Sequence, residues 1–307
     1  MPDSVLPKTS YRIVVVGDIH NQWSGHDEQA LSHLRADLVL FVGDFGNESL
    51  DIVGQIAQLP IPKAIAYGNH DAWYTATPWG QKRCPYDRHT DNWFQQQWDL
   101  LEPFQVGYRA LDFPELQLSV VGGRPFSWGG PKWFPKEFYR EWFDVTSEED
   151  SCDRILSAIQ SAQYDHVILL SHNGPTGLGD TPESTCGKDW EPRGGDFGDP
   201  DLRGAIAASP DKNISLVTFG HMHHTLRHRK DRLRERLVTD DRAIYLNAAV
   251  VPRVRVNDED SAHQFSVIDF QGAQIQTIQS IWIMPNGQVT SKEVLFTSQA
   301  KPLPLST

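Results

Sequence analysis

The chain has 307 residues and a formal net charge of −12, with a pI near 5.4. This acidic balance argues against a protein that is held on nucleic acid by phosphate neutralisation, because such binding needs clustered Lys and Arg. The one basic run, residues 227–236, also contains two acids and is interpreted as a solvated loop or hairpin. No apolar run approaches the ~20 residues that span a bilayer, and residues 1–10 lack a signal-peptide pattern. With three cysteines that have no C-x-x-C spacing, the sequence predicts a cytoplasmic protein without a membrane partner.

Five apolar runs of strand length each end at a small residue that is followed by Asp, Asn or His. The runs are RIVVVGDIH (12–20), DLVLFVGDFGN (37–47), PKAIAYGNHD (63–71), YDHVILLSHNGP (164–175) and ISLVTFGHMH (214–223). Amphipathic helices predicted at 27–36 and 48–59 separate the first three runs, which is typical of a β-α-β succession. Because ligands bind at the carboxyl ends of strands in open α/β sheets, the five endings predict an active site on one rim.

The interval 72–163 is too long for a simple crossover and is interpreted as an insertion. Seven of the ten Trp of the chain lie in it. A further strand is predicted at 115–123, and the stretches 92–104 and 132–143 are predicted to be helical in part. The aromatic residues either pack helices onto the sheet or, for one or two of them, flank a flat group of the substrate.

After this interval the pattern returns to helices and strands. Thr146, with Glu149 three residues later, predicts a capping box ahead of a helix at 153–162. The Gly- and Pro-rich segment 173–200 is longer than a usual connection and is either an active-site loop or a mobile surface loop. Four further strands are predicted, at 243–254, 263–270, 274–284 and 288–296. The last of these alternate in polarity, which favours an antiparallel half.

Seven side chains after the five runs offer oxygen or nitrogen to a metal: Asp18, His20, Asp44, Asn69, His172, His221 and His223. Two pairs among them have i, i+2 spacing, which leaves both members on one face of an extended chain. The carboxylate of Asp44 can hold one ion with each oxygen. One shared carboxylate among seven ligands predicts two ions, and a set without thiolate suits Mn²⁺, Fe or Zn²⁺.

The blocks GDIH, GDFGN, GNHD, the histidine of SHNGP and GHMH resemble, in this order, the signature of the calcineurin-like metallophosphoesterase superfamily. The resemblance implies an α/β fold, a four-layer α/β/β/α sandwich of two mixed sheets with the Trp-rich insertion near the active-site rim. Residues 1–307 are then expected to form a single domain. The implied activity is hydrolysis of a small-molecule phosphomonoester or phosphodiester by a hydroxide that bridges two metal ions.

The resemblance also implies a role for each residue of the site. It assigns one ion to Asp18, His20, Asp44 and His223, and the other ion to Asp44, Asn69, His172 and His221. It makes His70 the catalytic histidine that serves the leaving oxygen, with Asp71 orienting it. Mn²⁺ is the expected metal, with Fe or Zn²⁺ as alternatives.

Departures from known branches of the superfamily narrow the substrate class. Ser/Thr protein phosphatases carry GDxVDRG where this chain has GDFGNES, and lipid A precursor pyrophosphatases have Arg where His70 stands. A small phosphorylated substrate is therefore expected. Two alternatives stay open, a non-catalytic interaction module on the same fold and a nuclease that acts on nucleic-acid ends. The complete ligand set disfavours the first, and the acidic balance disfavours the second.

Four residues are candidates for contacts with the rest of the substrate: Arg124, Lys188, Arg193 and His224. Arg124 follows a strand-like run next to glycines that let backbone approach closely. The alternative for each basic residue is an ordinary surface charge, and extended alternation would point His224 away from His221 and His223. The sequence does not name the substrate or the oligomeric state.

Overall fold

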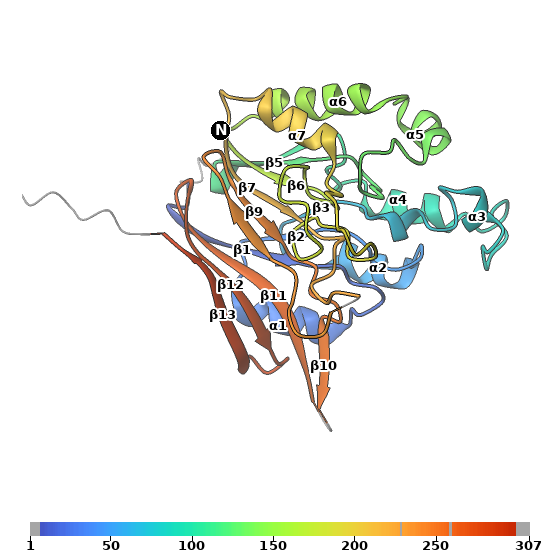
Figure 1. Ribbon diagram of the computed structural model, residues 1–307. Helices are drawn as coiled ribbons and strands as arrows, with labels where there is room; N and C mark the ends of the chain where they lie inside the picture. The colour runs from blue at the N-terminus through green and yellow to red at the C-terminus, as the bar shows by residue number, and fades with distance from the viewer. Residues whose placement is uncertain (1–6, 228, 258–259, 299–307) are drawn as a thin grey trace, which may run out of the picture.

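The computed structural model describes residues 7–227, 229–257 and 260–298, which form two mixed β-sheets with helices (Figure 1). Residues 1–6, in which a signal-peptide pattern was sought, lie outside the described residues. No helix of the described chain is both long and apolar enough to cross a membrane.

The first sheet has the strand order β13-β12-β11-β1-β2-β3, and β10 pairs with β11. Its strands are β1 (Ser10–Val16), β2 (Leu38–Phe41), β3 (Lys63–Ile65), β10 (Val254–Asn257), β11 (Asp260–Gln271), β12 (Gln274–Ile283) and β13 (Val289–Thr297). β1, β2 and β3 run parallel, whereas β11 runs antiparallel to β1 and to β12. The three N-terminal motif strands therefore lie side by side, and the C-terminal strands extend the same sheet.

The second sheet has the order β4-β5-β6-β7-β9-β8. Its strands are β4 (Ala110–Phe113), β5 (Leu118–Gly122), β6 (His166–Leu170), β7 (Asn213–Phe219), β8 (Leu237–Thr239) and β9 (Ile244–Asn247). β5, β6, β7 and β9 are parallel, and the edge strands β4 and β8 are antiparallel to their neighbours. The remaining two motif strands, β6 and β7, lie at the centre of this sheet.

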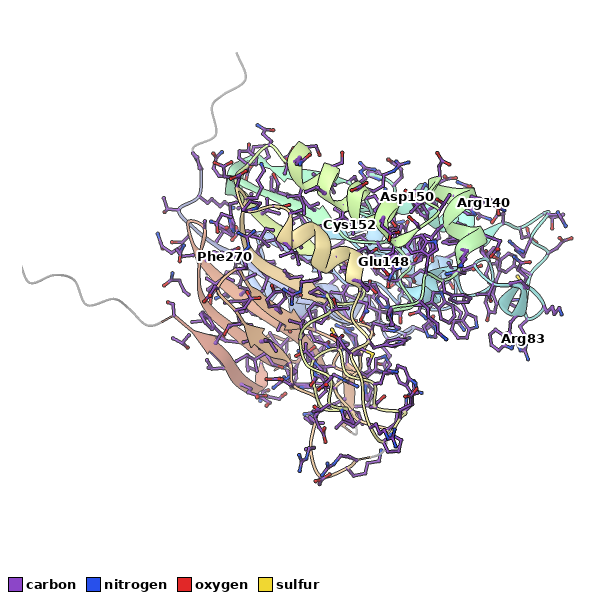
Figure 2. All side chains as sticks on the ribbon, turned by 45° about the horizontal axis from the view of Figure 1, so that its top comes forward. Arg83, Arg140, Glu148, Asp150, Cys152 and Phe270 are labelled. Atoms are coloured by element: carbon purple, nitrogen blue, oxygen red, sulfur yellow. The ribbon has the colours of Figure 1, made fainter. Side chains whose placement is uncertain are left out.

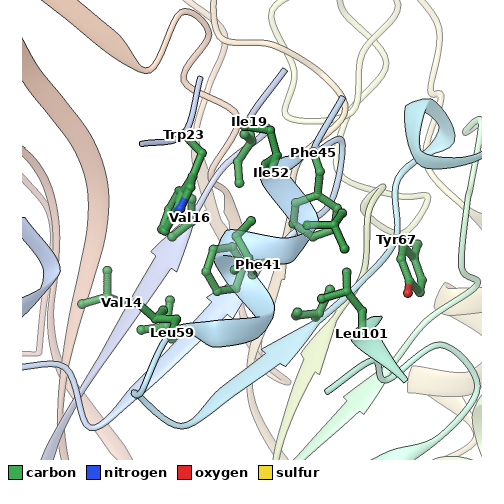
Figure 3. Packing of buried hydrophobic residues seen from close by; sticks show 14 of the residues in the cluster. Val14, Val16, Ile19, Trp23, Phe41, Phe45, Ile52, Leu59, Tyr67 and Leu101 are labelled. Atoms are coloured by element: carbon green, nitrogen blue, oxygen red, sulfur yellow. The ribbon is translucent and has the colours of Figure 1, made fainter. Parts of the chain in front are cut away.

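The two faces of β1 belong to different layers of the core, because successive side chains of a strand point to opposite sides. Ile13 and Val15 lie in the buried cluster that also contains Ile168 and Leu216 of the second sheet. Val14 and Val16 face the other way and pack against the helices on the outer face. Figure 3 shows both with Phe41, Ile52 and Leu59 of the same cluster. The sheets thus face each other across a shared apolar layer, as expected for this α/β fold.

Helices cover the outer face of each sheet (Figure 1). α1 (Gly25–Leu34), α2 (Leu50–Gln58) and α4 (Trp93–Leu101) pack on the first sheet, and α6 (Glu148–Ser161) and α7 (Pro200–Ala207) pack on the second. The other helical segments are η1 (Asn69–Ala72), α3 (Pro78–Gln81), η2 (Pro114–Leu116) and α5 (Lys136–Phe143). α6 starts earlier than predicted, because Ser147 caps it by accepting a hydrogen bond from the Asp150 N–H and Thr146 lies outside the helix.

The interval 72–163 is only partly an insertion. Its strands β4 and β5 form an edge of the second sheet, and its helix α6 covers that sheet. Most of its remaining aromatic residues pack on the first sheet, for example Trp98 and Trp142. Figure 2 shows Arg83 at the outer end of this segment, far from Phe270 on β11. Most aromatic side chains of the Trp-rich segment therefore pack against the sheets, and only a few of them can lie at the active site.

Candidate metal centre

All seven predicted metal ligands, together with His70, follow the carboxyl ends of the five motif strands. Asp18 and His20 follow β1, Asp44 follows β2, Asn69 and His70 follow β3, His172 follows β6, and His221 and His223 follow β7. Because the two sheets face each other, these ends meet at one edge of the sandwich. Their side chains divide into two groups that share Asp44.

The first group consists of Asp18, His20 and His223, and it meets Asp44 through His20. His20 Nε2 lies 3.0 Å from His223 Nε2 and 3.7 Å from Asp44 Oδ2. His223 Nε2 lies 3.3 Å from Asp18 Oδ2. Asp18, His20 and His223 each offer a ligand atom within one small volume, and so do His20, Asp44 and His70.

The second group surrounds the other oxygen of Asp44. His172 Nε2 lies 3.4 Å from Asp44 Oδ1 and 3.1 Å from Asn69 Oδ1. His221 Nδ1 lies 3.0 Å from the same Asn69 oxygen. Asp44 thus presents one oxygen to each group, which is the arrangement that a bridging carboxylate requires.

The donor atoms of the second group fit a cation. His172 Nδ1 donates a hydrogen bond to the carbonyl of Val42 at 2.8 Å, so Nε2 of the neutral ring carries a lone pair. That lone pair faces the oxygens of Asp44 and Asn69, which are also acceptors. Burial lowers the pKa of His221 to about 3, which keeps its ring neutral. Acceptor atoms of Asp44, Asn69 and His172 therefore converge beside a neutral imidazole, and a divalent ion suits such a set of oxygen and nitrogen donors.

The backbone turns sharply to bring these ligands together. His20, Asp44 and His221 have φ angles of 45°, 54° and 65°, in the left-handed region that residues other than Gly seldom adopt. Two glycines permit the close approach of the chains. A Cβ on Gly68 would lie 2.2 Å from Asp44 Oδ1, and one on Gly220 would lie 2.0 Å from Asp18 Oδ1. The glycine that precedes the ligands is therefore required by space in these two motifs.

His70 is held by Asn47, not by Asp71. The Nδ1 of His70 donates to Asn47 Oδ1 at 2.6 Å, and the imidazole stacks on Trp73 with ring centroids 4.5 Å apart. In the neutral ring this leaves a lone pair on Nε2, and burial lowers the pKa of His70. The expectation that Asp71 orients this ring is therefore corrected by the structure, because no bond joins the two side chains among the described contacts.

Asp71 instead braces the turns that carry the ligands. Its buried carboxylate accepts hydrogen bonds from the backbone N–H groups of Asp44, Phe45 and Gly68, at 2.9, 2.8 and 2.7 Å. Burial raises the pKa of Asp71, and the three N–H donors oppose that rise. A single side chain thereby ties the loop after β2 to the loop after β3.

A cavity of about 490 Å³ opens at these groups. Asp44, Asn69, His70, His221 and His223 lie in its lining. Four aromatic residues also line it: Trp73, Trp128, Trp190 and Phe197. Its volume is in the range of sites that hold whole small molecules. Two Trp of the interval 72–163 therefore do reach the site, as one of the two sequence-based interpretations allowed.

The family model of the calcineurin-like phosphoesterases matches residues 11–225. The chain belongs to this family. Among curated proteins no sequence matches this phosphoesterase significantly.

Solved structures resemble this phosphoesterase at low sequence identity. A structure of PhoD has a TM-score of 0.51 at 10% identity, over 98% of this chain and 74% of that one. The protein TT1561 of Thermus thermophilus has a TM-score of 0.49 at 11% identity, over 87% of this chain and 98% of that one. At 10% identity the likeness to PhoD concerns the fold alone. Family membership makes this chain a metal-dependent hydrolase of phosphoesters.

The four predicted substrate contacts do not line the cavity of the phosphoesterase. Arg124 is buried and pairs with Asp199 at 2.7 Å, so its charge is neutralised inside the protein. His224 is also buried, and its Nε2 lies 3.1 Å from the carbonyl oxygen of Asn247, which turns the ring away from the ligand pair as alternation suggested. Lys188 pairs with Glu191, and Arg193 is an exposed residue of the loop 173–200.

Several residues of the phosphoesterase site were missed from the sequence. Asn47 ends the block GDFGN, and that block was the available signal. Asp189, Trp190 and Phe197 come from the loop 173–200, where only composition could be interpreted. Two further lining residues, Arg227 and Arg234, come from the run 227–236 that was interpreted as solvated. The interpretation of this run as solvated was wrong at Arg234, which is buried, whereas the side chain of Arg227 is 70% exposed although it also lines the cavity.

Proposed function

We propose that this phosphoesterase hydrolyses small-molecule phosphomonoesters or phosphodiesters at a centre of two divalent ions. The observation that carries the proposal is the position of Asp44 between the two ligand groups, with one carboxylate oxygen facing His20 and the other facing His172. Asp18, His20, Asp44 and His223 would hold one ion, and Asp44, Asn69, His172 and His221 the other. Two ions, when bound, bind phosphoryl oxygens as Lewis acids and lower the pKa of water, so that a nucleophile forms near neutral pH.

The chain itself supplies the means to handle the leaving group. His70 lines the cavity next to Asp44 and Asn69, and its Nδ1–H is fixed by Asn47. Its Nε2 carries a lone pair in the neutral ring, so it would first take up a proton from solvent and then pass that proton to the leaving oxygen. A proton at this position is most useful for an alkoxide, which is a poor leaving group.

The surroundings support a small substrate. The cavity is a pocket with aromatic walls, and Arg227 and Arg234 are its basic lining residues. Mn²⁺ is the metal that we propose, because the carboxylate and amide oxygens of the set suit it, and the imidazoles keep Fe and Zn²⁺ as alternatives. A cytoplasmic location and a single domain over residues 1–307 also remain proposals. Packing of strands from both halves of the chain into one cluster supports the single domain.

The proposal is tested by metal analysis together with turnover of p-nitrophenyl phosphate and bis-p-nitrophenyl phosphate. We expect about two metal ions per chain, loss of turnover on chelation, and its return when Mn²⁺ is added. Bound metal without hydrolysis of any phosphoester would favour the non-catalytic interaction module. Turnover of single-stranded oligonucleotide ends far above that of both small esters would favour the nuclease.

A further inference from the structure

Arg227, a lining residue of the cavity, has a charged side chain whose terminal nitrogens make no hydrogen bond among the described residues. Arg227 lines the cavity, and its side chain is 70% exposed. Its backbone N–H donates to Asp189 Oδ2 at 2.9 Å, which fixes where the side chain starts. Among the described residues, neither Nη group of Arg227 has a hydrogen-bond partner. A guanidinium therefore stands in the cavity with its two terminal nitrogens available.

The second arginine of the cavity uses most of its donors inside the protein. Arg234 is buried, and its Nε donates to the carbonyl of His223 at 2.9 Å. Its Nη1 donates to the carbonyls of Ser184 and Gly187, both at 2.7 Å. Arg234 thus ties the loop 173–200 to a predicted metal ligand. Among the described contacts its Nη2 has no hydrogen bond and lies 3.6 Å from Asp189 Oδ2, whereas both Nη groups of Arg227 lack a hydrogen bond.

The charges around the two arginines do not balance. Asp189 Oδ1 lies 3.8 Å from Arg227 Nε, and Asp189 Oδ2 lies 3.6 Å from Arg234 Nη2. One carboxylate is therefore shared by two guanidinium groups, and the trio keeps a net positive charge. A positive charge on the wall of a cavity attracts an anion.

Aromatic rings connect this wall to the metal ligands. The Arg227 guanidinium lies 5.4 Å from the centroid of the Trp190 ring. Trp190 meets Phe197 edge to face, and Phe197 is nearly parallel to the ring of His221. Arg227 therefore contacts the wall at Trp190, and two ring contacts continue from Trp190 to the predicted ligand His221. Because Arg227 is not one of the predicted ligands, a group that it binds can be a part of the substrate other than the reacting phosphoryl group.

We propose that Arg227 binds a second oxyanion group of the substrate, so that preferred substrates are phosphoesters with a further phosphate or carboxylate. This proposal rests on the proposed function. Guanidinium matches either group because it can donate two parallel hydrogen bonds. A cavity of about 490 Å³ leaves room for the rest of such a molecule.

The test compares matched substrates on wild type, Arg227→Ala and Arg229→Ala. The phosphate pair is adenosine 5′-monophosphate and adenosine 3′,5′-bisphosphate, and the carboxylate pair is phenyl phosphate and 4-carboxyphenyl phosphate. Arg229 is the control, because it lies in the same run, pairs with Glu183 and Asp231 at 2.9 Å and does not line the cavity. p-Nitrophenyl phosphate reports basal hydrolysis in each protein.

We expect wild type to favour the member with the second oxyanion group in at least one pair. Arg227→Ala should lower kcat/KM for that member by about ten- to a hundredfold, mainly through KM, since one charge-assisted contact is lost. The member without the second group and p-nitrophenyl phosphate should change by less than about threefold. The pair that loses its preference identifies phosphate or carboxylate as the bound group.

Three results would overturn the role of Arg227. Wild type could show no preference within either pair, the variant could lose activity equally on both members, or Arg229→Ala could have the same effect as Arg227→Ala. Absence of turnover of every ester, including p-nitrophenyl phosphate, would instead reject the proposed function and this inference with it.

Discussion

The edge of the sandwich, which carries the seven predicted metal ligands, differs in construction from the wall of the cavity. The wall is formed by the four aromatic lining residues and Arg227. At the edge, each ligand follows a buried strand within a few residues, and backbone hydrogen bonds such as those to Asp71 hold the turns. On the wall, Trp128 and Trp190 come from long irregular segments and are held by contacts between rings and with arginine. Backbone-held turns tolerate little change, whereas a wall of stacked rings can be altered without loss of the fold. The edge should therefore determine the reaction, and the wall should determine the substrate.

Removal of the shared carboxylate should have the largest effect. Asp44→Ala takes away the one group that contributes an oxygen to both sets of ligands. We expect loss of metal from the purified protein and a fall in kcat of about a thousandfold or more, because metal ions contribute several kcal/mol to such reactions. Metal analysis and turnover of p-nitrophenyl phosphate measure the two effects. Asp51→Asn, at an exposed position of α2, is the control and should change neither. An Asp44→Ala protein with full metal content would contradict the assignment of Asp44 as a ligand shared by both ions.

His70→Ala separates proton transfer from metal binding. The ring lies beside the ligand groups but is held through Asn47 and Trp73. We expect normal metal content and a loss in kcat of about a hundredfold to ten-thousandfold for alkyl phosphates. The loss should be smaller for p-nitrophenyl phosphate, because nitrophenolate leaves without a proton. Normal activity of this variant on both substrates would reject the catalytic role of His70.

Asp71 holds the turns that carry the ligands, whereas Asn47 holds the ring of His70, and the substitutions Asp71→Asn and Asn47→Ala test these two roles separately. The amide that Asp71→Asn introduces would turn an NH₂ group toward backbone N–H donors that now bind a carboxylate. We expect Asp71→Asn to lower the free energy of unfolding by about 1–3 kcal/mol and to weaken metal retention. Asn47→Ala should instead lower kcat with little change in metal content. Urea unfolding and metal titration of both variants check this contrast, and identical effects of the two substitutions would contradict it.

The same difference explains what the sequence could and could not predict. A continuous apolar run that stops at Gly-Asp or Gly-Asn-His marks a buried strand and its ligands, since both the burial and the glycine are local requirements. The five strands and the positions of the ligand-type residues after them were therefore recognisable. Asn47 was missed because its role depends on a contact with His70, 23 residues away.

Errors arose where a residue's partner lies far along the chain. Arg124 was a candidate for a substrate contact, with a surface charge as the alternative, but it is buried in an ion pair with Asp199, 75 residues later. Arg234 was interpreted as solvated, but it is buried through hydrogen bonds to Ser184 and Gly187 in another segment. The choice between the adjacent cap residues Thr146 and Ser147 is a separate, local case that the backbone geometry decides. Spacing within one segment carries no information about such long-range pairs.

The smallest predicted effect concerns the wall. Trp128 stacks on Trp73 with ring centroids 5.4 Å apart, and Trp73 in turn stacks on His70. Trp128→Ala removes a flat lining surface and should raise KM for p-nitrophenyl phosphate by about three- to tenfold, as expected for the loss of about 1 kcal/mol of ring contact. KM for glycerol 3-phosphate, which has no ring, should hardly change.

Trp79→Ala is the matched control, because Trp79 also contacts Trp73 but is exposed and does not line the cavity. It should leave KM for both substrates unchanged. If Trp128→Ala instead lowers kcat for both substrates with KM unaltered, the stack supports His70 and the wall belongs to the catalytic machinery. In that case the edge and the wall would not have separate roles at Trp128, because the stack of Trp128, Trp73 and His70 would act in the reaction as well as in substrate binding.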